Sequence, residues 1–261
     1  MKKIFILLTF ILFFENAFAQ RQKIEIKLND KDTLNLWYDI YKADKLPAPT
    51  IIVLHGCGGV DEHHKGWAEL IQSWGYNAII LDSFTGVATQ KVCDNFKQEF
   101  TRPNIRATSA LHLAEHISNQ EWSTKKLGAI GYSHGGWTVL WLSNKEHRSN
   151  FQNPKIISAV AYYPYCETVL KYTKRDIDIE IHHGSIDDWT PLSLCLDLAK
   201  NWKLLLGKNL HVYQDAHHGF DRKNYNWSGN SASGFVTLKT NEEARQLSMK
   251  RTKEFFDRTL K

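Results

Sequence analysis

The sequence predicts an α/β fold in which a mostly parallel central sheet carries helices on both faces. Three observations support this class. Residues 50–54 and 78–81 are continuous, largely β-branched apolar runs, which are typical of strands buried on both faces of a parallel sheet. Helical patterns of ten or more residues separate such runs, as in βαβ units. Glycine-rich sequence follows the first run, as expected where a strand turns into a helix.

The remaining elements follow in alternation. Residues 23–28 and 33–41 alternate apolar with polar side chains across a polar turn, which predicts an antiparallel hairpin at the sheet edge. Further strands are expected at 127–130, 156–162, 177–181 and 209–213. Helices are expected at 65–74, 105–117, 135–142, 192–206 and 241–260. The stretch between 162 and 177 is too short for a large cap domain, so we expect none.

Two long stretches, 84–103 and 219–238, have no regular pattern. Both begin where a strand should end at the carboxyl edge of the sheet. Because open α/β sheets bind ligands at this edge, and connections of this length are uncommon without a role, we expect both stretches near a functional site.

The first nineteen residues predict a secretory signal peptide. Lys2 and Lys3 precede an apolar run, and Ala17 and Ala19 form a small-x-small cleavage signature before Gln20. The run is about half of the ~20 residues that span a bilayer, so no membrane span is expected in the mature form. We therefore expect one domain over 20–261, exported to a periplasm or secreted.

Composition excludes several classes of protein. Hydrophobic residues make up 43% of the chain, which is enough for a sizeable core and unlike a disordered chain. The formal net charge is +5, but the basic residues are scattered among acidic ones. A nucleic-acid-binding protein concentrates its positive charge on one face, so no nucleic-acid partner is expected.

Four cysteines, Cys57, Cys93, Cys166 and Cys195, follow the expected signal peptide. An even count in an exported chain favours disulfides, although four cysteines allow three connectivities. Cys57 and Cys93 follow neighbouring strands at the carboxyl edge, as Cys166 and Cys195 follow the next two, so we expect the pairs Cys57–Cys93 and Cys166–Cys195. None has CxxC spacing, and no metal site is predicted.

The clearest motif is a G-x-S-x-G sequence at 131–135. It follows an expected strand directly and precedes a helical pattern, which is the setting of a nucleophile elbow. The turn from strand to helix is strained, and a Cβ at Gly131 or Gly135 would collide with neighbouring backbone. The turn presents the Ser133 hydroxyl at a helix N-terminus, so Ser133 is the candidate nucleophile.

A second glycine-rich segment, 55–59, follows the strand at 50–54. Acyl transfer needs two backbone N–H groups directed at the tetrahedral oxyanion, one from the residue after the nucleophile and one from this loop. We therefore expect the amides of His134 and Cys57 to form the oxyanion hole.

The acid of a catalytic triad is expected in the segment 183–191, which offers two adjacent carboxylates. Only one of them can face a histidine. Asp187 comes first after the strand and four residues before Pro191, which should start the next helix. Asp187 is therefore preferred, and Asp188 is read as a surface or helix-terminal carboxylate.

The base is expected in the pair His217 and His218. His218 is preferred because it precedes a glycine at a turn after the last strand. The resulting chain order, Ser133 then Asp187 then His218, differs from the orders in chymotrypsin-type and subtilisin-type enzymes and is that of α/β-hydrolases.

The motifs LHGCGG at 54, LDSF at 81, GYSHGGW at 131, YYP at 162, GSIDDWTP at 184 and HHGFD at 217 resemble the dienelactone hydrolase family of α/β-hydrolases. The resemblance implies the α/β-hydrolase fold, hydrolysis of small ester or lactone substrates, no cofactor, and the triad above. The namesake enzymes carry a cysteine nucleophile and a glutamate in the oxyanion loop. This chain has Ser133 and Gly56 at those positions, which favours a general serine esterase over a dienelactone hydrolase.

Three residues are expected to bind substrate. Trp189 and Phe220 should line a shallow, open site. Arg222 lies four residues after His218, where the resemblance implies an arginine that holds a substrate carboxylate; a solvated surface arginine is the alternative.

The sequence thus predicts an exported serine hydrolase acting on small esters or lactones. A peptidase or acyltransferase with the same triad, or a non-catalytic ligand-binding protein of this fold, remain alternatives.

Overall fold

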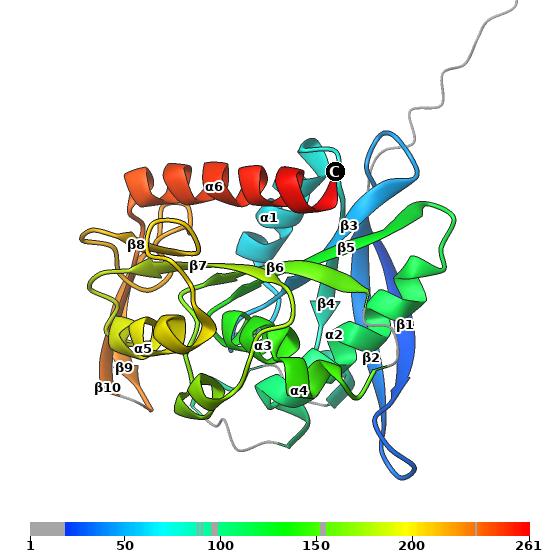
Figure 1. The fold of residues 1–261 in the computed structure, drawn as a ribbon, viewed down its shortest axis with the longest axis horizontal. Coiled ribbons are helices and arrows are strands. Elements are labelled where there is room, and N and C mark those ends of the chain that lie inside the picture. The colour runs from blue at the N-terminus through cyan, green and yellow to red at the C-terminus, as the bar shows by residue number, and fades with distance from the viewer. Residues whose placement is uncertain (1–18, 88, 90, 95–98, 152–154, 233) are drawn as a thin grey trace, which may run out of the picture.

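The computed structural model describes residues 19–87, 89, 91–94, 99–151, 155–232 and 234–261. Eight strands form one sheet in the order β1-β2-β4-β3-β5-β6-β7-β8 (Figure 1). The strands are β1 (Gln20–Lys27), β2 (Thr33–Tyr41), β3 (Ala48–Leu54), β4 (Asn77–Asp82), β5 (Ser123–Tyr132), β6 (Ile156–Tyr162), β7 (Asp178–Gly184) and β8 (Leu210–Tyr213). The pairs β1–β2 and β2–β4 are antiparallel, and all other neighbours are parallel. Most of the expected signal peptide, 1–18, lies outside the described residues.

Helices cover both faces of this sheet, as the sequence predicted (Figure 1). One face carries α1 (Glu62–Ser73) and α6 (Glu242–Leu260), and the other carries α2 (Pro103–Ser118), α3 (His134–Ser143) and α5 (Leu192–Trp202). Each helical layer encloses its own apolar cluster, because alternate residues of the central strands face opposite sides. The continuous apolar runs of β3 and β4 are buried along their length for this reason. In the part of the chain that the structure describes, no large cap domain covers the sheet.

The strand order brings together segments that are distant in sequence. β3 and β5 are adjacent, and Leu54 at the end of β3 is in register with Gly131 near the end of β5. The loops that follow β7 and β8 are likewise adjacent, since Gly184 pairs with Tyr213. All four loops leave the carboxyl edge of the sheet, which is where the candidate site residues lie.

One stretch expected to be irregular contains regular structure. Within 219–238 the chain forms a separate two-stranded hairpin, β9 (Asn226–Ser231) and β10 (Gly234–Lys239), near α5 (Figure 1). Its side chains are largely exposed, so neither strand carries the apolar alternation by which a strand is recognised. The hairpin is anchored to the site through the Lys239 amide, which donates to the His218 carbonyl at 3.2 Å.

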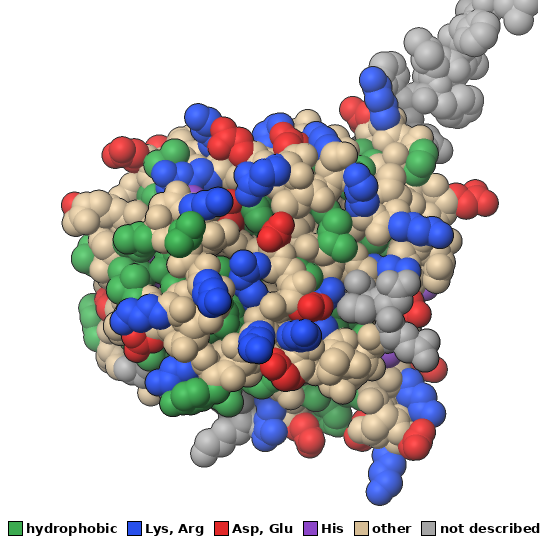
Figure 2. Space-filling model, viewed as in Figure 1, with side chains coloured by type: hydrophobic (Ala, Val, Ile, Leu, Met, Phe, Trp, Pro, Cys, Tyr) green, Lys and Arg blue, Asp and Glu red, His purple; other side chains and the backbone are tan. Residues whose placement is uncertain are grey.

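The described part of the other stretch, 84–103, holds only two short 3-10 turns, η1 (Thr85–Val87) and η2 (Glu99–Thr101), before α2 begins. A four-residue helix α4 (Lys145–Arg148) and a turn η3 (Thr168–Tyr172) complete the chain. Among the described residues, no helix is both long and apolar enough to cross a membrane. On the face shown in Figure 2, basic side chains lie among acidic and uncharged ones.

Candidate active site

Ser133 lies at a sharp turn between β5 and α3. Its backbone has φ 54° and ψ −114°, a conformation that L-residues rarely adopt. A Cβ at Gly131 would meet the Gly135 carbonyl, and one at Gly135 would meet the Leu54 carbonyl. Glycine at both positions therefore permits the close approach of β5, α3 and β3 that holds this turn, as the G-x-S-x-G motif predicts.

Three side chains from three different loops form one hydrogen-bonded chain. The Ser133 Oγ lies 2.9 Å from His218 Nε2, and His218 Nδ1 lies 2.9 Å from Asp187 Oδ2. His218 and Asp187 are buried, whereas Ser133 is partly exposed to the cleft. The chain thus has the geometry of a nucleophile, a base and an orienting acid. His218, and not its neighbour His217, faces the serine.

Asp187 is held as an anion by several donors. The amides of Trp189 and Thr190 each donate to its Oδ1 at 2.9 Å, and the Thr190 hydroxyl donates to its Oδ2 at 2.9 Å. Burial alone would raise the pKa of Asp187, but the His218 ring and these hydrogen bonds bring it down to about 2. Asp188 is exposed instead and accepts from the Thr237 amide of β10.

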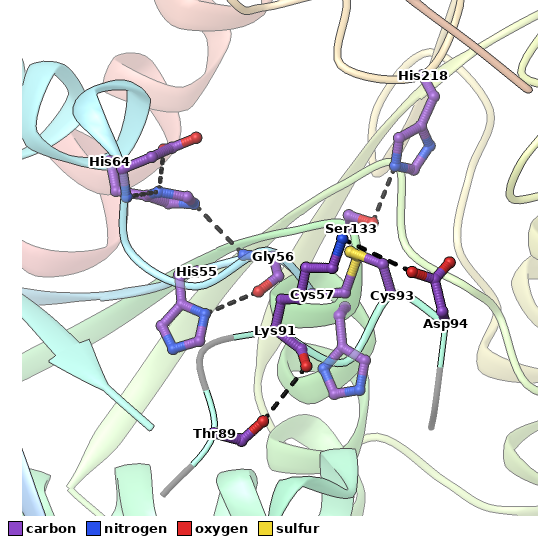
Figure 3. The surroundings of a disulfide bond; sticks show 12 residues. His55, Gly56, Cys57, His64, Thr89, Lys91, Cys93, Asp94, Ser133 and His218 are labelled. Atoms are coloured by element: carbon purple, nitrogen blue, oxygen red, sulfur yellow. Dashed lines mark hydrogen bonds and ion pairs between the residues drawn. A yellow bond between two sulfur atoms is a disulfide. The ribbon is translucent and has the colours of Figure 1, made fainter. Parts of the chain in front are cut away.

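The loop after β3 lies against the serine and is tied down at three points. Its Cys57 is bonded to Cys93 in a disulfide (Figure 3). The Val92 amide donates to the Cys57 carbonyl at 2.8 Å. The amide of Gly56 donates to His64 Nε2 at 3.3 Å. Cys166 and Cys195 form the second disulfide, so both pairs are those expected from the strand order. Two disulfides suggest an oxidising, extracytoplasmic environment.

His64 belongs to a relay that the sequence did not reveal. Its Nδ1 contacts the carboxylate of Asp61, which also accepts from the Arg222 guanidinium at 2.8 Å. Burial lowers the pKa of His64 to about 4, against the opposing effect of Asp61. Burial would raise the pKa of Asp61, but His64 and Arg222 hold it well below its usual range. The loop after β8 is thereby connected to the loop after β3 through a relay of Arg222, Asp61, His64 and the amide of Gly56.

A second group absent from the sequence prediction is Arg106 of α2. Its guanidinium is fully buried, lies 2.6 Å from His134 Nδ1 and donates to the His55 carbonyl at 2.7 Å. Burial lowers the pKa of Arg106 to about 9, and burial beside Arg106 lowers the pKa of His134 well below its usual value. Arg106 thus joins His134, the residue after Ser133, to the loop after β3. Its position within a helical pattern gave no sign of this contact.

Ser133 lies on the border between two cavities. The first, of about 350 Å³, is lined by His218, Asp61, Arg222, Tyr225 and Trp227 among others. The second, of about 310 Å³, has a mostly aromatic wall made by Trp137, Tyr165 and Trp189. Cys57, Ser133 and Trp189 line both cavities.

The three expected substrate contacts have different outcomes. Trp189 lines both cavities, with its ring centroid 5.0 Å from that of His218. The expectation for Phe220 is wrong, because its side chain is 0% exposed and packs on Tyr162, Tyr163 and Tyr213 beneath the site. Arg222 lines the first cavity, but its guanidinium is already paired with a carboxylate of this chain.

Two clusters of ligand-type side chains occur among the described residues, and their members also contact other side chains of the protein. In the first, Asp61 and His63 are engaged by Arg222 and Asp221. In the second, Glu180 faces His182 and His211, whose rings are stacked at 4.9 Å with planes only 23° apart.

This fold and this site define an α/β-hydrolase. The model of the dienelactone hydrolase family matches residues 38–260, and the chain therefore belongs to the dienelactone hydrolase family, whose members are hydrolases. No curated protein sequence matches the chain.

Solved structures share the fold at low sequence identity. A dienelactone hydrolase-like promiscuous phosphotriesterase from metagenomic libraries has a TM-score of 0.68 and 16% identity, over 93% of this chain and 99% of that one. Dienelactone hydrolase from Anabaena variabilis has a TM-score of 0.67 and 13% identity, over the same shares. Est1E from Butyrivibrio proteoclasticus has a TM-score of 0.59 and 15% identity, over 91% of this chain and 98% of that one.

Proposed function

We propose that the protein is a serine hydrolase that cleaves small carboxylic esters or lactones through Ser133, His218 and Asp187. The observation that carries the proposal is the continuous hydrogen-bonded chain from Ser133 Oγ through both ring nitrogens of His218 to a buried, ionised Asp187. A binding protein has no need for this arrangement. Membership of a hydrolase family supports the same reading.

In the proposed mechanism, His218 takes the proton of Ser133 as the hydroxyl attacks the carbonyl carbon. Asp187 holds the ring in the tautomer that leaves Nε2 free and stabilises the imidazolium that forms. The amides of His134 and Cys57 stabilise the oxyanion, each contributing on the order of 3 kcal/mol. His218 then protonates the leaving alcohol, and a water that it activates hydrolyses the acyl-enzyme.

The protein is also proposed to act after export. A signal peptide over residues 1–19, with cleavage before Gln20, leaves the four cysteines in a compartment where disulfides persist. The Cys57–Cys93 bridge lies in the oxyanion loop, so oxidation and assembly of the site would go together.

A fluorophosphonate probe tests the proposed nucleophile. We expect stoichiometric labelling of Ser133 in the wild-type protein and none in Ser133→Ala, with loss of p-nitrophenyl acetate hydrolysis in the same variant. The site of labelling is read by peptide mass mapping. Labelling of another residue, or equal labelling of Ser133→Ala, would contradict the proposal. Hydrolysis of a peptide substrate but of no ester would favour the peptidase alternative.

A further inference from the structure

The two cavities that meet at Ser133 differ in chemistry, which points to the two halves of an ester. We propose that the substrate is an ester of an aromatic carboxylic acid with a neutral, hydroxyl-rich alcohol. This proposal rests on the serine-hydrolase function proposed above. The ring of the acid occupies the cavity walled by Trp137, Tyr165 and Trp189. The alcohol occupies the cavity beside His218 and the β9–β10 hairpin.

The position of the base decides which half lies where. In acyl transfer, the histidine that accepted the nucleophile's proton returns it to the leaving alkoxide, so the leaving oxygen must be on the histidine side of the serine. His218 lines the first cavity. His134, whose amide is assigned to the oxyanion, lines the second. The alcohol therefore belongs in the first cavity and the acyl group in the second.

The wall of the acyl cavity is aromatic and held in place. The indole N–H of Trp137 donates to Glu167 Oε2 at 3.0 Å, which fixes the orientation of its ring. Tyr165 meets Trp137 edge to face, with centroids 5.1 Å apart, and the adjacent Cys166 is anchored by its disulfide. Aromatic rings pack well in such pre-formed slots through offset or edge-to-face contacts. Because the aromatic side chains of the wall are already fixed, a planar acyl group can make these contacts without the entropic cost of ordering them.

The charges of the alcohol cavity are balanced within the protein. Arg222 pairs with Asp61 at 2.8 Å, and Lys91 faces Asp94 at 3.7 Å. A charged alcohol would have to break one of these pairs to bind. The same cavity also offers the Asn230 amide and the partly exposed ring of Trp227. Hydroxyl groups can donate to and accept from such polar side chains without any change in charge.

Four esters that differ in one half at a time test this assignment. We compare kcat/KM for glyceryl benzoate, glyceryl acetate, methyl benzoate and methyl acetate. The wild type is expected to prefer benzoate over acetate, and glyceryl over methyl, each by roughly tenfold or more. Trp137→Ala should abolish the acyl preference and keep the alcohol preference, and Trp227→Ala should do the reverse.

The helix offers a matched control in Trp141. Its indole N–H donates to the same Glu167 oxygen at 3.0 Å, but the second cavity is lined by Trp137. Trp141→Ala should therefore retain both preferences. If it changes them as Trp137→Ala does, the effect comes from helix packing and the assignment is wrong.

The labelling rate of Ser133 by a small alkyl fluorophosphonate separates the possible failures. If the wild type is not labelled, the proposed function fails. If it is labelled but prefers acetate, or if Trp137→Ala lowers kcat/KM equally for both acyl groups, the substrate assignment is overturned. Should Trp137→Ala not fold, Tyr165→Ala provides the same comparison from the adjacent ring of the same wall.

Discussion

Asp187 and Asp188 are neighbours in the chain, but their carboxylates have different surroundings. Asp187 is buried and accepts from two amides, a hydroxyl and the His218 ring. Asp188 is exposed and accepts from the Thr237 amide of the hairpin. With a pKa of about 2, Asp187 is ionised throughout the neutral range. The difference between the two aspartates is thus one of hydrogen-bond partners.

Exchange of each carboxylate for an amide tests this difference. Asp187→Asn should lower kcat by about 10⁴, because an amide can favour the wrong tautomer of His218. Asp188→Asn is the matched control and should stay within a few-fold of wild type, since an amide oxygen can still accept from Thr237. Steady-state kinetics at neutral pH measures both. Similar losses in the two variants would contradict the role proposed for Asp187.

At the scale of single residues, the sequence could predict which side chains at strand ends form the candidate site. It could not predict which residues from distant parts of the chain contact them. Ser133, Asp187 and His218 each follow a strand within a short motif, so chain order and strand edges were sufficient to propose them. Phe220 was expected to line the open site together with Trp189. Two positions beyond His218 the chain has already turned inward, and the ring is buried. Arg106 was missed because its contacts lie 28 and 51 residues away.

At the scale of elements, the loop after β3 is joined to three other segments of the fold. The Cys57–Cys93 disulfide joins it to the segment after β4, Arg106 joins it to α2, and His64 joins it to α1. Oxyanion stabilisation depends on amides that are already oriented before the reaction begins. Under the proposed mechanism, the loss of any of these restraints is expected to lower the rate of the chemical step.

The variant Arg222→Ala distinguishes two roles for this residue. Arg222 either holds the loop after β3 in place through Asp61 and His64, or binds a carboxylate of the substrate. Arg222→Ala releases Asp61 and so loosens the hold of His64 on the Gly56 amide. We expect kcat to fall several-fold, by a similar factor for neutral and carboxylate-bearing esters, because an oxyanion effect does not depend on the substrate's charge. The neighbouring, exposed Lys223→Ala serves as control and should leave kcat unchanged.

The clamp alternative has a different signature. If Arg222 holds a substrate carboxylate, Arg222→Ala will raise KM for carboxylate-bearing esters and leave neutral esters unaffected. Kinetics on an ester pair that differs only in a remote carboxylate distinguishes the two roles. That result would assign Arg222 to the substrate and would contradict the relay.

The sequence predicted helices and strands where packing against the core imposes a periodic pattern of apolar residues. The sheet strands and the main helices follow apolar patterns that come from burial on one or two faces, and their order fixes the fold class. The hairpin β9–β10 was read as irregular because its side chains are mostly exposed and burial imposes little pattern on it. Its two strands are in register from Asn226 with Lys239 to Ser231 with Gly234. Backbone pairing of this kind leaves little trace in side-chain composition.

At the scale of the whole molecule, several histidines are buried and uncharged. Burial lowers the pKa of His55, His134 and His182 well below the ordinary value, and that of His183 less strongly. In the unfolded chain each would bind a proton near pH 6.5. The unfolded state therefore takes up more protons than the folded state below that pH. Stability is fully present above about pH 6.5 and is lost as the pH falls.

We therefore predict that the protein begins to lose stability at a pH well above the usual pKa range of carboxylates. Each such histidine costs up to about 1.4 kcal/mol per pH unit, and only between its unfolded and its folded pKa. Asp187 and Asp221, both with a pKa of about 2 in the fold, add a further loss as the pH falls from about 4 towards 2. Urea unfolding at about pH 7 and about pH 5 measures the first effect. Equal unfolding free energies at these two pH values would contradict it.

The position of Ser133 between two cavities has a consequence for how this enzyme can change over time. One side is built by α3 and the loop after β6, both of which pack against the core. The other side includes a hairpin that pairs with itself and leaves the eight-stranded sheet untouched. Substitutions at the exposed positions of the hairpin can therefore reshape one wall at a small cost in folding, whereas the aromatic wall is tied to the stability of the molecule. Divergence among descendants of this chain should accumulate on the hairpin side first.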